Sequence, residues 1–428
     1  MIRLYDFDEV RPEDILNRDI RAEANVEAAV DAIIADVRAR GDAALIDYAA
    51  KFDHAQLDSV RVSVQEIEDA FALLEKDDPE FITTLKMAAE NIRHFHEQQL
   101  HKNFVMTDRP GIVLGQKYTP IQRAGVYVPG GTAAYPSTVL MDVIPAKVAG
   151  VQQIVMMTPA GRDGKVNPNI LAAAVIAGID CIFKSGGAQA VAALAYGTES
   201  VPAVDKIVGP GNIYVATAKR KVFGKVGIDM IAGPSEILVL ADGSCNPAWV
   251  AADMLSQAEH DKLASPVLVT DSAELAKAVQ AELEVQIPQL PRAAIARESV
   301  DTNGKIIVTD DMNKAIEAVN IIAPEHLEIC VDDPFAVLNK IRNAGSIFLG
   351  KNVPEALGDY FAGPNHTLPT SGTARFSSPL GVDDFVKKSS FIYYTREALG
   401  EVQSRIADFA EHEGLHAHAK SVTIRFEE

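Results

Sequence analysis

Two short stretches of the chain combine residue types that bind metals or transfer protons. In residues 256–261, Gln257 and His260 lie three positions apart near the end of an expected helix, so helical periodicity turns both side chains to one face. Asp359 and His418 are distant candidates for two further ligands. An amide oxygen, two imidazoles and a carboxylate suit zinc, manganese or cobalt. Taken alone, this spacing is more often that of a solvated polar helix face, and both interpretations stay open.

The second stretch is Ala323-Pro324-Glu325-His326-Leu327. A proline at this place is typical of the first turn of a helix, whose positive end would keep Glu325 ionised and lower the pKa of His326. A neutral imidazole can accept a proton from an alcohol. The pattern therefore indicates an acid–base pair, and the alternative is a glutamate in a first helical turn beside an incidental histidine.

The elements that must position these residues follow a βα pattern. Runs of β-branched residues recur about every 25 to 28 residues, and each ends in a glycine or proline turn before a helical segment. The runs are 125–128, 153–157, 181–184 and 206–208, and a second series has runs at 236–240, 266–270, 305–308 and 346–349. The pattern predicts an α/β protein with two Rossmann-like domains, mostly parallel sheets, and small N- and C-terminal extensions.

The turns of the first series are rich in glycine: 129–131, 159–161, 185–187 and 209–212. Glycines between a strand and a helix allow a phosphate to approach the helix N-terminus. The usual GxGxxG fingerprint is absent, however, so the turns leave nucleotide binding and ordinary βα connections both open. The helix that carries Gln257 is expected to begin at Asn246 as N-cap, with Pro247 in its first position.

The expected domain borders follow from these changes of pattern. We expect an N-terminal arm at 1–20 and a C-terminal extension at 376–428. Residues 21–110 together with 235–375 would form one α/β domain with the metal and acid–base residues, and 111–234 would form a second, nucleotide-binding domain.

Composition excludes several classes of partner. The chain of 428 residues has 59 acidic and 40 basic residues, a net charge of −19, which disfavours nucleic acids and anionic membranes. No apolar run approaches the ~20 residues of a membrane span, and the first residues do not begin a signal peptide. The three cysteines form no CxxC pair. The composition predicts a cytoplasmic protein without nucleic-acid or membrane partners.

Nine motifs, in register over nearly the whole chain, resemble those of the histidinol dehydrogenase family. They are Tyr127-Val128-Pro129-Gly130-Gly131, Ser185-Gly186-Gly187-Ala188-Gln189-Ala190, Gly209-Pro210-Gly211-Asn212, Ala232-Gly233-Pro234-Ser235-Glu236, Ser256-Gln257-Ala258-Glu259-His260, Ala323-Pro324-Glu325-His326-Leu327, Gly358-Asp359-Tyr360, Asn365-His366-Thr367-Leu368-Pro369-Thr370 and Glu413-Gly414-Leu415-His416-Ala417-His418.

The resemblance implies roles for particular residues. One zinc ion per subunit would be held by Gln257, His260, Asp359 and His418. NAD would contact Tyr127, Gln189 and Asn212. The substrate would contact the four zinc ligands and also Ser235, His326, His366 and Glu413, with Glu325 and His326 as the acid–base pair.

The resemblance also implies a reaction and an assembly. The reaction is the four-electron oxidation of L-histidinol to L-histidine through L-histidinal, the final steps of histidine biosynthesis, with two NAD molecules reduced in turn. The family is homodimeric, so Glu413 and His418 would act in the partner's active site. Two alternatives are a zinc- and NAD-dependent dehydrogenase of another small amino or sulfonated alcohol, and a metal-dependent hydrolase, although HExxH is absent.

Overall fold

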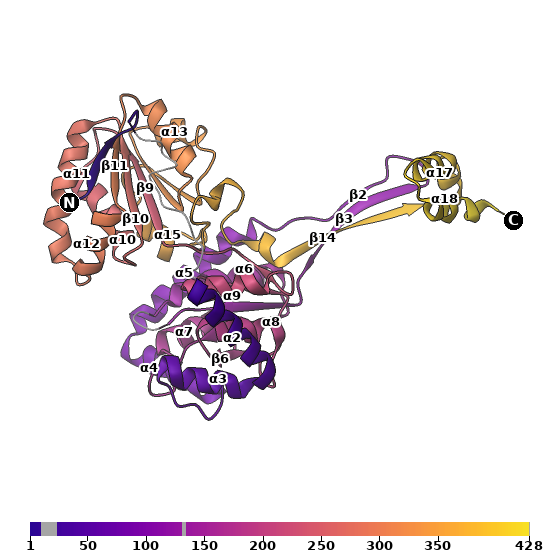
Figure 1. Cartoon of the computed structure of the whole chain (residues 1–428), viewed down its shortest axis with the longest axis horizontal. Helices are drawn as coiled ribbons and strands as arrows, with labels where there is room; N and C mark the ends of the chain where they lie inside the picture. The colour runs from indigo at the N-terminus through magenta and orange to yellow at the C-terminus, as the bar shows by residue number, and fades with distance from the viewer. Residues whose placement is uncertain (10–23, 131–133, 428) are drawn as a thin grey trace. The chain divides into compact units, whose positions relative to one another are not determined.

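A computed structural model of the chain describes residues 1–9, 24–130 and 134–427. It consists of two units, Met1–Gln99 with Ile121–Phe385 and Leu100–Pro120 with Val386–Glu428. The first unit contains two parallel sheets with helices on their faces, and the second contains an antiparallel sheet followed by short helices (Figure 1). These sheets confirm the α/β class with mostly parallel strands. None of the helices in the described ranges is long and apolar enough to cross a membrane.

A five-stranded parallel sheet lies in the first unit. Its strands, in spatial order, are β6 (Ile182–Lys184), β5 (Gln153–Thr158), β4 (Arg123–Tyr127), β7 (Lys206–Val208) and β8 (Gly227–Ile228). All its neighbouring strands pair in parallel. From β4 the chain first builds outward to β6 and then returns to add β7 on the other side. The order of strands therefore reverses between β4 and β7, and such reversals are where open parallel sheets bind ligands, outside the carboxyl ends of the strands.

Helices cover both faces of the five-stranded sheet because neighbouring residues of its strands point to opposite sides. Val126 and Met156 pack with one set of helices, and Val155 and Met157 with the other. The first set is α4 (Val64–Asp77), α5 (Pro79–Glu97), α6 (Pro136–Ala149) and α7 (Pro168–Ala177); the second is α2 (Ala24–Arg40), α3 (Asp42–Tyr48), α8 (Gly187–Tyr196) and α9 (Ile213–Val222).

This packing corrects one expected domain border. Residues 21–110 were expected to join residues 235–375, but α2 to α5 contribute their apolar faces to the cores of the five-stranded sheet. Their amphipathic patterns predict helices correctly, yet an apolar stripe does not specify which of two sheets it will cover.

A six-stranded parallel sheet forms the rest of the first unit. Its spatial order is β1 (Arg3–Asp6), β11 (Lys305–Val308), β10 (Ser265–Thr270), β9 (Glu236–Ala241), β12 (His326–Cys330) and β13 (Ser346–Leu349). The expectation of an N-terminal arm is wrong for Arg3–Asp6, which pairs with β11 as an edge strand; residues 10–20 lie outside the described part. All six residues of β9 are buried, as is typical of a parallel sheet covered on both faces.

The covering helices come from the segments between the strands. α10 (Pro247–Ala258), α11 (Ala273–Gln286) and α12 (Ala293–Thr302) share one core cluster, and α13 (Met312–Ile322) and α14 (Pro334–Leu338) share the other. α10 begins as predicted, because the Asn246 side chain accepts a hydrogen bond from the Ala248 amide at 2.9 Å and Pro247 occupies the first turn.

The second unit is built on long-range antiparallel pairing. β14 (Val386–Tyr394) pairs along its whole length with β3 (Ile112–Pro120), which also pairs with β2 (Phe104–Met106). The chain then forms α16 (Arg396–Gly400), α17 (Gln403–His412) and α18 (His416–Thr423). The expected extension at 376–428 therefore differs in two ways: residues up to Phe385 belong to the first unit, and residues 100–120 join the second.

Candidate active site

The predicted acid–base pair lies at the amino end of two neighbouring strands. His326 is the first residue of β12, and it lies opposite Ile237 of β9. The expected helix at Pro324 is wrong: α13 ends at Ile322, Ala323 adopts a left-handed conformation with φ of 51°, and the chain enters a strand. Burial of Leu327 and Ile329 in the core on one face of the sheet outweighs the local helix-start signal.

The main chain of Glu236 holds both members of the pair. Its amide donates a hydrogen bond to Glu325 Oε2 at 2.8 Å, and its carbonyl oxygen lies 3.0 Å from His326 Nδ1. Because a carbonyl oxygen can only accept a hydrogen bond, Nδ1 carries a proton and Nε2 is the nitrogen available to the site. One residue of β9 thus fixes the positions of two side chains that come from another part of the chain.

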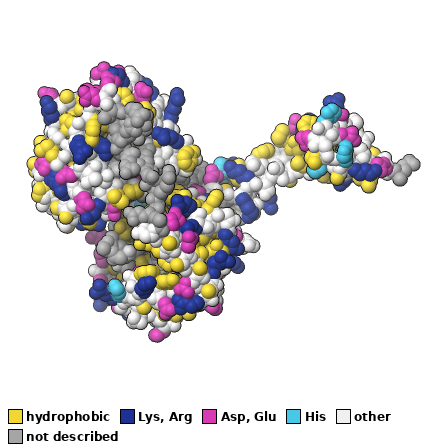
Figure 2. All heavy atoms as spheres, viewed as in Figure 1, with side chains coloured by type: hydrophobic (Ala, Val, Ile, Leu, Met, Phe, Trp, Pro, Cys, Tyr) yellow, Lys and Arg dark blue, Asp and Glu magenta, His cyan; other side chains and the backbone are white. Residues whose placement is uncertain are grey.

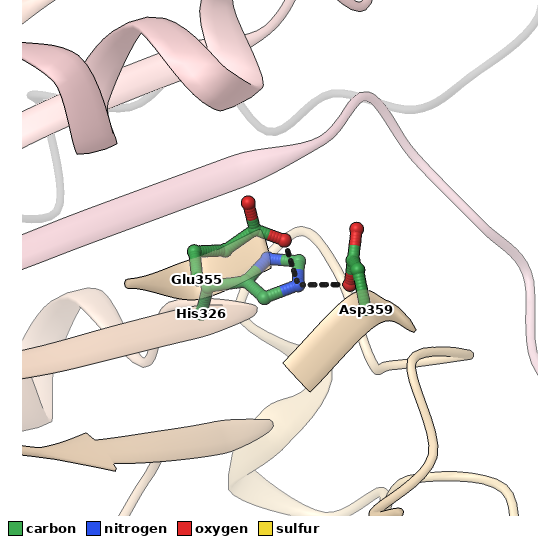
Figure 3. Close-up of side chains that lie close together, drawn as sticks. All are labelled: His326, Glu355 and Asp359. Carbon is green, nitrogen blue, oxygen red and sulfur yellow. Dashed lines mark ion pairs between the residues drawn. The ribbon is translucent and has the colours of Figure 1, made fainter. Parts of the chain in front are cut away.

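Two carboxylates from a short helix face His326 Nε2. α15 (Glu355–Tyr360) carries Glu355 and Asp359 four positions apart, so both lie on one helix face. Glu355 Oε1 is 3.7 Å and Asp359 Oδ1 is 3.6 Å from His326 Nε2 (Figure 3). Asp359 was predicted as a candidate metal ligand, and Glu355 was missed. The signal that could have found Glu355 is its i, i+4 spacing from Asp359 ahead of a loop rich in glycine, proline and histidine.

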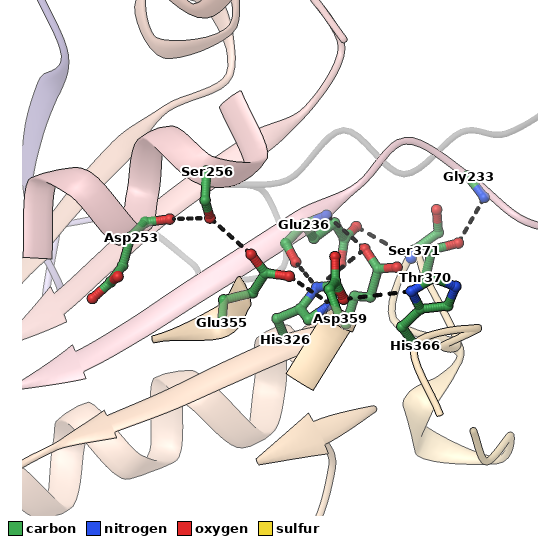
Figure 4. A network of polar contacts seen from close by, with 11 residues as sticks. Gly233, Glu236, Asp253, Ser256, His326, Glu355, Asp359, His366, Thr370 and Ser371 are labelled. Atoms are coloured by element: carbon green, nitrogen blue, oxygen red, sulfur yellow. Dashed lines mark hydrogen bonds and ion pairs between the residues drawn. The ribbon is translucent and has the colours of Figure 1, made fainter. Parts of the chain in front are cut away.

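Hydrogen bonds from β12 and α10 hold α15 in place. Glu328 Oε1, buried on β12, accepts a hydrogen bond from the Glu355 amide at 2.8 Å and so caps the N-terminus of α15. The Ser256 hydroxyl of α10 donates to Glu355 Oε2 at 2.9 Å (Figure 4). Gly358 permits the close approach of α15 to β13, because a Cβ atom there would lie 2.6 Å from the Phe348 ring. The helix is therefore fixed relative to His326 from several sides.

Electrostatics at the pair differ from the expectation for a helix terminus. Burial opposes a charged imidazole, but the carboxylates of Glu325, Asp359 and Glu355 outweigh burial and raise the pKa of His326 to about 10. Burial also raises the pKa of Glu325 to about 8, although His326 partly opposes this effect. The predicted low pKa of His326 and ionised Glu325 are therefore wrong for the protein without a bound cation. The expectation failed because no helix begins at Pro324 and because three carboxyl groups, those of Glu325, Glu355 and Asp359, lie around the imidazole of His326.

The loop after α15 places another imidazole beside Asp359. His366 Nδ1 lies 3.9 Å from Asp359 Oδ1, and burial lowers the pKa of His366. Burial would raise the pKa of Asp359, but the neighbouring imidazoles of His326 and His366 hold it well below its usual range. His326, Asp359 and His366 share one wall of a cavity of about 260 Å³ with apolar residues of β13, including Ile347 and Phe348. This cavity can hold a small polar molecule against both imidazoles.

The donor set at this cavity suits a divalent metal ion. One ligand atom each from His326, Glu355 and Asp359 can lie within 4.8 Å of the others, and His326 Nε2 and Glu355 Oε1 are buried without a hydrogen-bond partner among the described residues. Gln257, which is 1% exposed, also has a buried side-chain nitrogen without a described partner. Buried polar atoms of this kind are normally satisfied, so their number here indicates a bound group. Imidazole nitrogens and carboxylate oxygens are both ligands that zinc takes in proteins, and a glutamine side chain can add its amide oxygen.

The remaining predicted site residues fall into two groups. Ser235 immediately precedes β9, and His260 lies just beyond α10. Burial lowers the pKa of His260, and the charge of Asp359 opposes that effect. These residues belong to the first unit with the His326 cluster. Glu413 and His418 belong to the second unit, at the end of α17 and within α18. Their part in the site therefore stays a prediction.

The predicted NAD contacts lie on elements at the carboxyl edge of the five-stranded sheet. The Tyr127 hydroxyl, at the end of β4, accepts a hydrogen bond from the Gly187 amide at 3.1 Å, and burial raises the pKa of Tyr127 to about 12. Gln189 is buried in the first turn of α8. Asn212 caps α9 by accepting hydrogen bonds from the Tyr214 and Val215 amides. At the same edge, the loops after β4 and β5 line a cavity of about 630 Å³.

The five-stranded sheet has a cavity at its carboxyl edge, and the six-stranded sheet has a buried imidazole among carboxylates at its amino edge. This combination defines an α/β enzyme equipped for acid–base chemistry on a small polar substrate. Comparison with known proteins specifies the family. The model of the family "Histidinol dehydrogenase" matches residues 16–426. The chain is 53% identical to histidinol dehydrogenase of Listeria monocytogenes, over 98% of this chain and 96% of that protein, and 56% identical to that of Geobacter sulfurreducens, over 96% of each.

A solved structure agrees with the sequence comparisons. The crystal structure of histidinol dehydrogenase from Elizabethkingia anophelis matches with a TM-score of 0.94 and 39% identity, over 99% of this chain and 98% of that one. The chain belongs to the histidinol dehydrogenase family. The family resemblance drawn from the nine sequence motifs is thereby confirmed.

Proposed function

We propose that the chain oxidises L-histidinol to L-histidine through L-histidinal, with NAD as the electron acceptor, in the final steps of histidine biosynthesis. The observation that carries this proposal is the Glu325–His326 pair, aligned by the main chain of Glu236 beside a small cavity that His366 and Asp359 also line. Membership of the histidinol dehydrogenase family supports the choice of substrate. Dehydrogenation of an alcohol needs a proton acceptor at the reacting oxygen, and His326 Nε2 is directed into the site.

The two half-reactions use the two residues of the pair differently. In the first, the alcohol gives its proton to His326 Nε2 as a hydride leaves the adjacent carbon for NAD, which yields the aldehyde. In the second, water adds to the aldehyde while Glu325, ionised above its pKa of about 8, takes one proton of that water. A second hydride then leaves to give the carboxylic acid, which releases its proton to solvent as the carboxylate forms. The sum is four electrons, accepted as two hydrides by two NAD molecules.

The residues present also fit a zinc ion. We infer that Gln257, His260, Asp359 and His418 would hold it. Of the possible metal ligands His326, Glu355 and Asp359, only Asp359 would then bind the ion, and His326 Nε2 would remain available as the proton acceptor. When bound, the ion would supply a fixed positive charge that orients the amine and imidazole nitrogens of the substrate. Asp359 is one of the carboxylates that raise the pKa of His326. A cation bound to Asp359 would offset part of its negative charge and so lower the pKa of His326. The lower pKa favours the neutral imidazole, which can accept a proton.

NAD would bind at the carboxyl edge of the five-stranded sheet, where Tyr127, Gln189 and Asn212 are proposed contacts. Support comes from the reversal of strand order between β4 and β7 and from the cavity of about 630 Å³ at that edge. Gly209 also permits a close main-chain turn there: its φ is 116°, and a Cβ atom would lie 2.1 Å from the Tyr127 carbonyl oxygen. Arg162 and Lys165 of the cavity wall supply positive charge for phosphates.

We further propose a homodimer in which Glu413 and His418 complete the active site of the partner subunit. Support comes from apolar side chains that the second unit leaves exposed (Figure 2). On β14, Ile392 is 74% and Tyr393 57% exposed, and on α17 Phe409 is 69% exposed. An exposed apolar face of this kind marks a protein interface.

The proposed function is tested by the stoichiometry of turnover. Purified, zinc-loaded protein supplied with L-histidinol and NAD should form two NADH for each L-histidine, measured by absorbance and by amino-acid analysis. One NADH for each substrate molecule, or no turnover, contradicts the proposal. A panel of other small amino and sulfonated alcohols distinguishes the related dehydrogenase activities, and hydrolysis of ester or amide substrates without NAD would indicate a metal-dependent hydrolase.

A further inference from the structure

The carboxylate of Asp53 lines the cavity at the carboxyl edge of the five-stranded sheet. Asp53 ends a short π-helical turn, η1 (Ala49–Asp53), that follows α3. Its Oδ2 atom is shielded from solvent and has no hydrogen-bond partner among the described residues. A shielded carboxylate oxygen normally accepts hydrogen bonds, and its free lone pairs therefore need donors that a ligand can bring.

Asp53 lies close to one of the glycine turns that are expected to bind the nucleotide, the turn before α8. Its Oδ1 lies 3.7 Å from the point where a Cβ atom on Gly186 would stand. Gly186 is the N-cap of α8, and the next residue, Gly187, has a φ of 61° and donates its amide to Tyr127. A Cβ atom on Gly186 would also lie 3.1 Å from the Pro159 side chain, so the space at this position favours glycine. Asp53 and the start of α8 thus border the same space.

The charge around Asp53 defines what it can bind. Burial raises the pKa of Asp53 to about 6, and among the described residues the charge of the adjacent His54 opposes this effect. Above that pH Asp53 is an ionised acceptor with no lysine or arginine bound to it in the described part of the chain. Arg162 and Lys165 lie on the same cavity wall in the loop after β5, and both are exposed. The cavity therefore offers one acceptor site for hydroxyl groups and a separate, positive border for phosphates.

Resting on the NAD-dependent function proposed above, we propose that Asp53 accepts hydrogen bonds from the hydroxyl groups of the adenosine ribose of NAD and thereby excludes NADP. In parallel α/β sheets, an acidic side chain near the glycine turn serves this purpose where the usual fingerprint is present. A 2′-phosphate at the same place would remove a donor and bring a second negative charge against the carboxylate. Asp53 is then a specificity-determining residue supplied by the helical segment before the sheet.

The test compares ligands that differ only at this ribose. Binding of NAD, NADP and the NAD analogue with 2′-deoxyadenosine is measured by calorimetry for the wild type, Asp53→Asn and Asp163→Asn. Asp163 is the matched control, since it lies on the same cavity wall and its carboxylate already accepts the Lys165 amide. The wild type and Asp163→Asn should prefer NAD over both other ligands by about tenfold or more, as expected for a hydrogen bond to a charged group. Asp53→Asn should lose most of both preferences.

The outcomes separate this inference from the proposed function. If Asp53→Asn keeps the wild-type ratios of NAD to NADP and to the deoxy analogue, the role of Asp53 is wrong although NAD remains the cofactor. If the wild type binds NADP as tightly as NAD, through Arg162 for instance, the inference also fails. If the wild type binds no NAD at all, the proposed function itself fails. Should Asp53→Asn not fold, Asp53→Ser and the wild-type preference for NAD over the deoxy analogue decide the question.

Discussion

Replacement of Glu325 by glutamine isolates the electrostatic role of one member of the acid–base pair. Glutamine keeps an oxygen that can accept the Glu236 amide, which Glu325 Oε2 accepts at 2.8 Å, so the side chain should stay in place. The change removes only the ability to ionise. His326 Nδ1 lies 3.6 Å from Glu325 Oε2, and Glu325 is the largest of the charges that raise the pKa of His326.

The size of the effect follows from Coulomb's law at this distance. Two unit charges 3.6 Å apart interact by about 1 kcal/mol in water and by about 5 kcal/mol at an effective dielectric constant of about 20. Glu325, whose pKa is about 8, is ionised where His326 titrates near pH 10, so the whole interaction is lost in the variant. Each pKa unit corresponds to about 1.4 kcal/mol, and the pKa of His326 should therefore fall by about 1 to 3.

The assay is an NMR titration of metal-free protein with labelled histidine, in which His326→Asn identifies the signal of His326. Glu259→Gln is the matched control, because the charge of Glu259 acts on His260. The control should shift the titration of His260 and leave that of His326 unchanged. An unchanged or higher pKa of His326 in Glu325→Gln would refute the ion pair as the cause of its raised pKa, and with it the electrostatic account of this site.

Three further predictions concern the metal, the assembly and the buried charges. His260→Asn should lower zinc content and activity together, whereas His326→Asn should keep near-normal zinc by elemental analysis and lose about 10²- to 10⁴-fold in kcat; normal zinc in His260→Asn contradicts the ligand set. If His418 acts across a dimer, inactive His418→Asn and Glu325→Gln subunits should regain activity when co-expressed as mixed dimers, and persistent inactivity places His418 in its own chain's site. Burial, reinforced by the charge of Asp229, raises the pKa of Asp142 well above its usual value. At this carboxyl group the folded protein therefore binds more protons than the unfolded chain, and the folded state loses stability as pH rises above about 4. Asp142→Asn should therefore gain stability relative to the wild type between pH 5 and pH 8, by about 1.4 kcal/mol for each unit by which the pKa is raised, as measured by urea unfolding; a difference that does not change with pH contradicts this.

The sequence best predicts those strands and helix ends that depend on neighbouring residues. The β-branched run at 305–308 and the run at 346–349 coincide with β11 and β13, and the capping signal at Asn246 locates the start of α10. Parallel α/β architecture follows from the alternation of such runs. Pairing between distant segments has no local pattern, so the edge position of Arg3–Asp6 and the joining of 112–120 with 386–394 escaped prediction.

The same limit applies within the site. Glu325 and His326 were identified, but their environment was inferred from the local proline, which suggested a helix. The true partners are the Glu236 main chain, about ninety positions earlier in the sequence, and two carboxylates of α15. A main-chain group has no side-chain signature, and Glu355 offered only its spacing from Asp359. The residue types of a site can thus be read from the sequence while their protonation states depend on neighbours that only folding supplies.

The loop after α15 shows how the fold connects the two sheets of the first unit at the site. The Asn365 side chain donates to the Met141 carbonyl of α6 at 2.6 Å, and the Thr367 hydroxyl donates to Asp142 of the same helix at 2.9 Å. A few residues later, the Ser371 amide donates to the Glu236 side chain at 3.2 Å (Figure 4). His366 lies between these attachments, so the segment that carries it is tied to a helix of the five-stranded sheet and to the strand whose main chain aligns Glu325 and His326. The hydride transfer that we propose, from a substrate at one sheet to NAD at the other, would depend on such a connection, because a displacement of about 1 Å can cost about a hundredfold in rate.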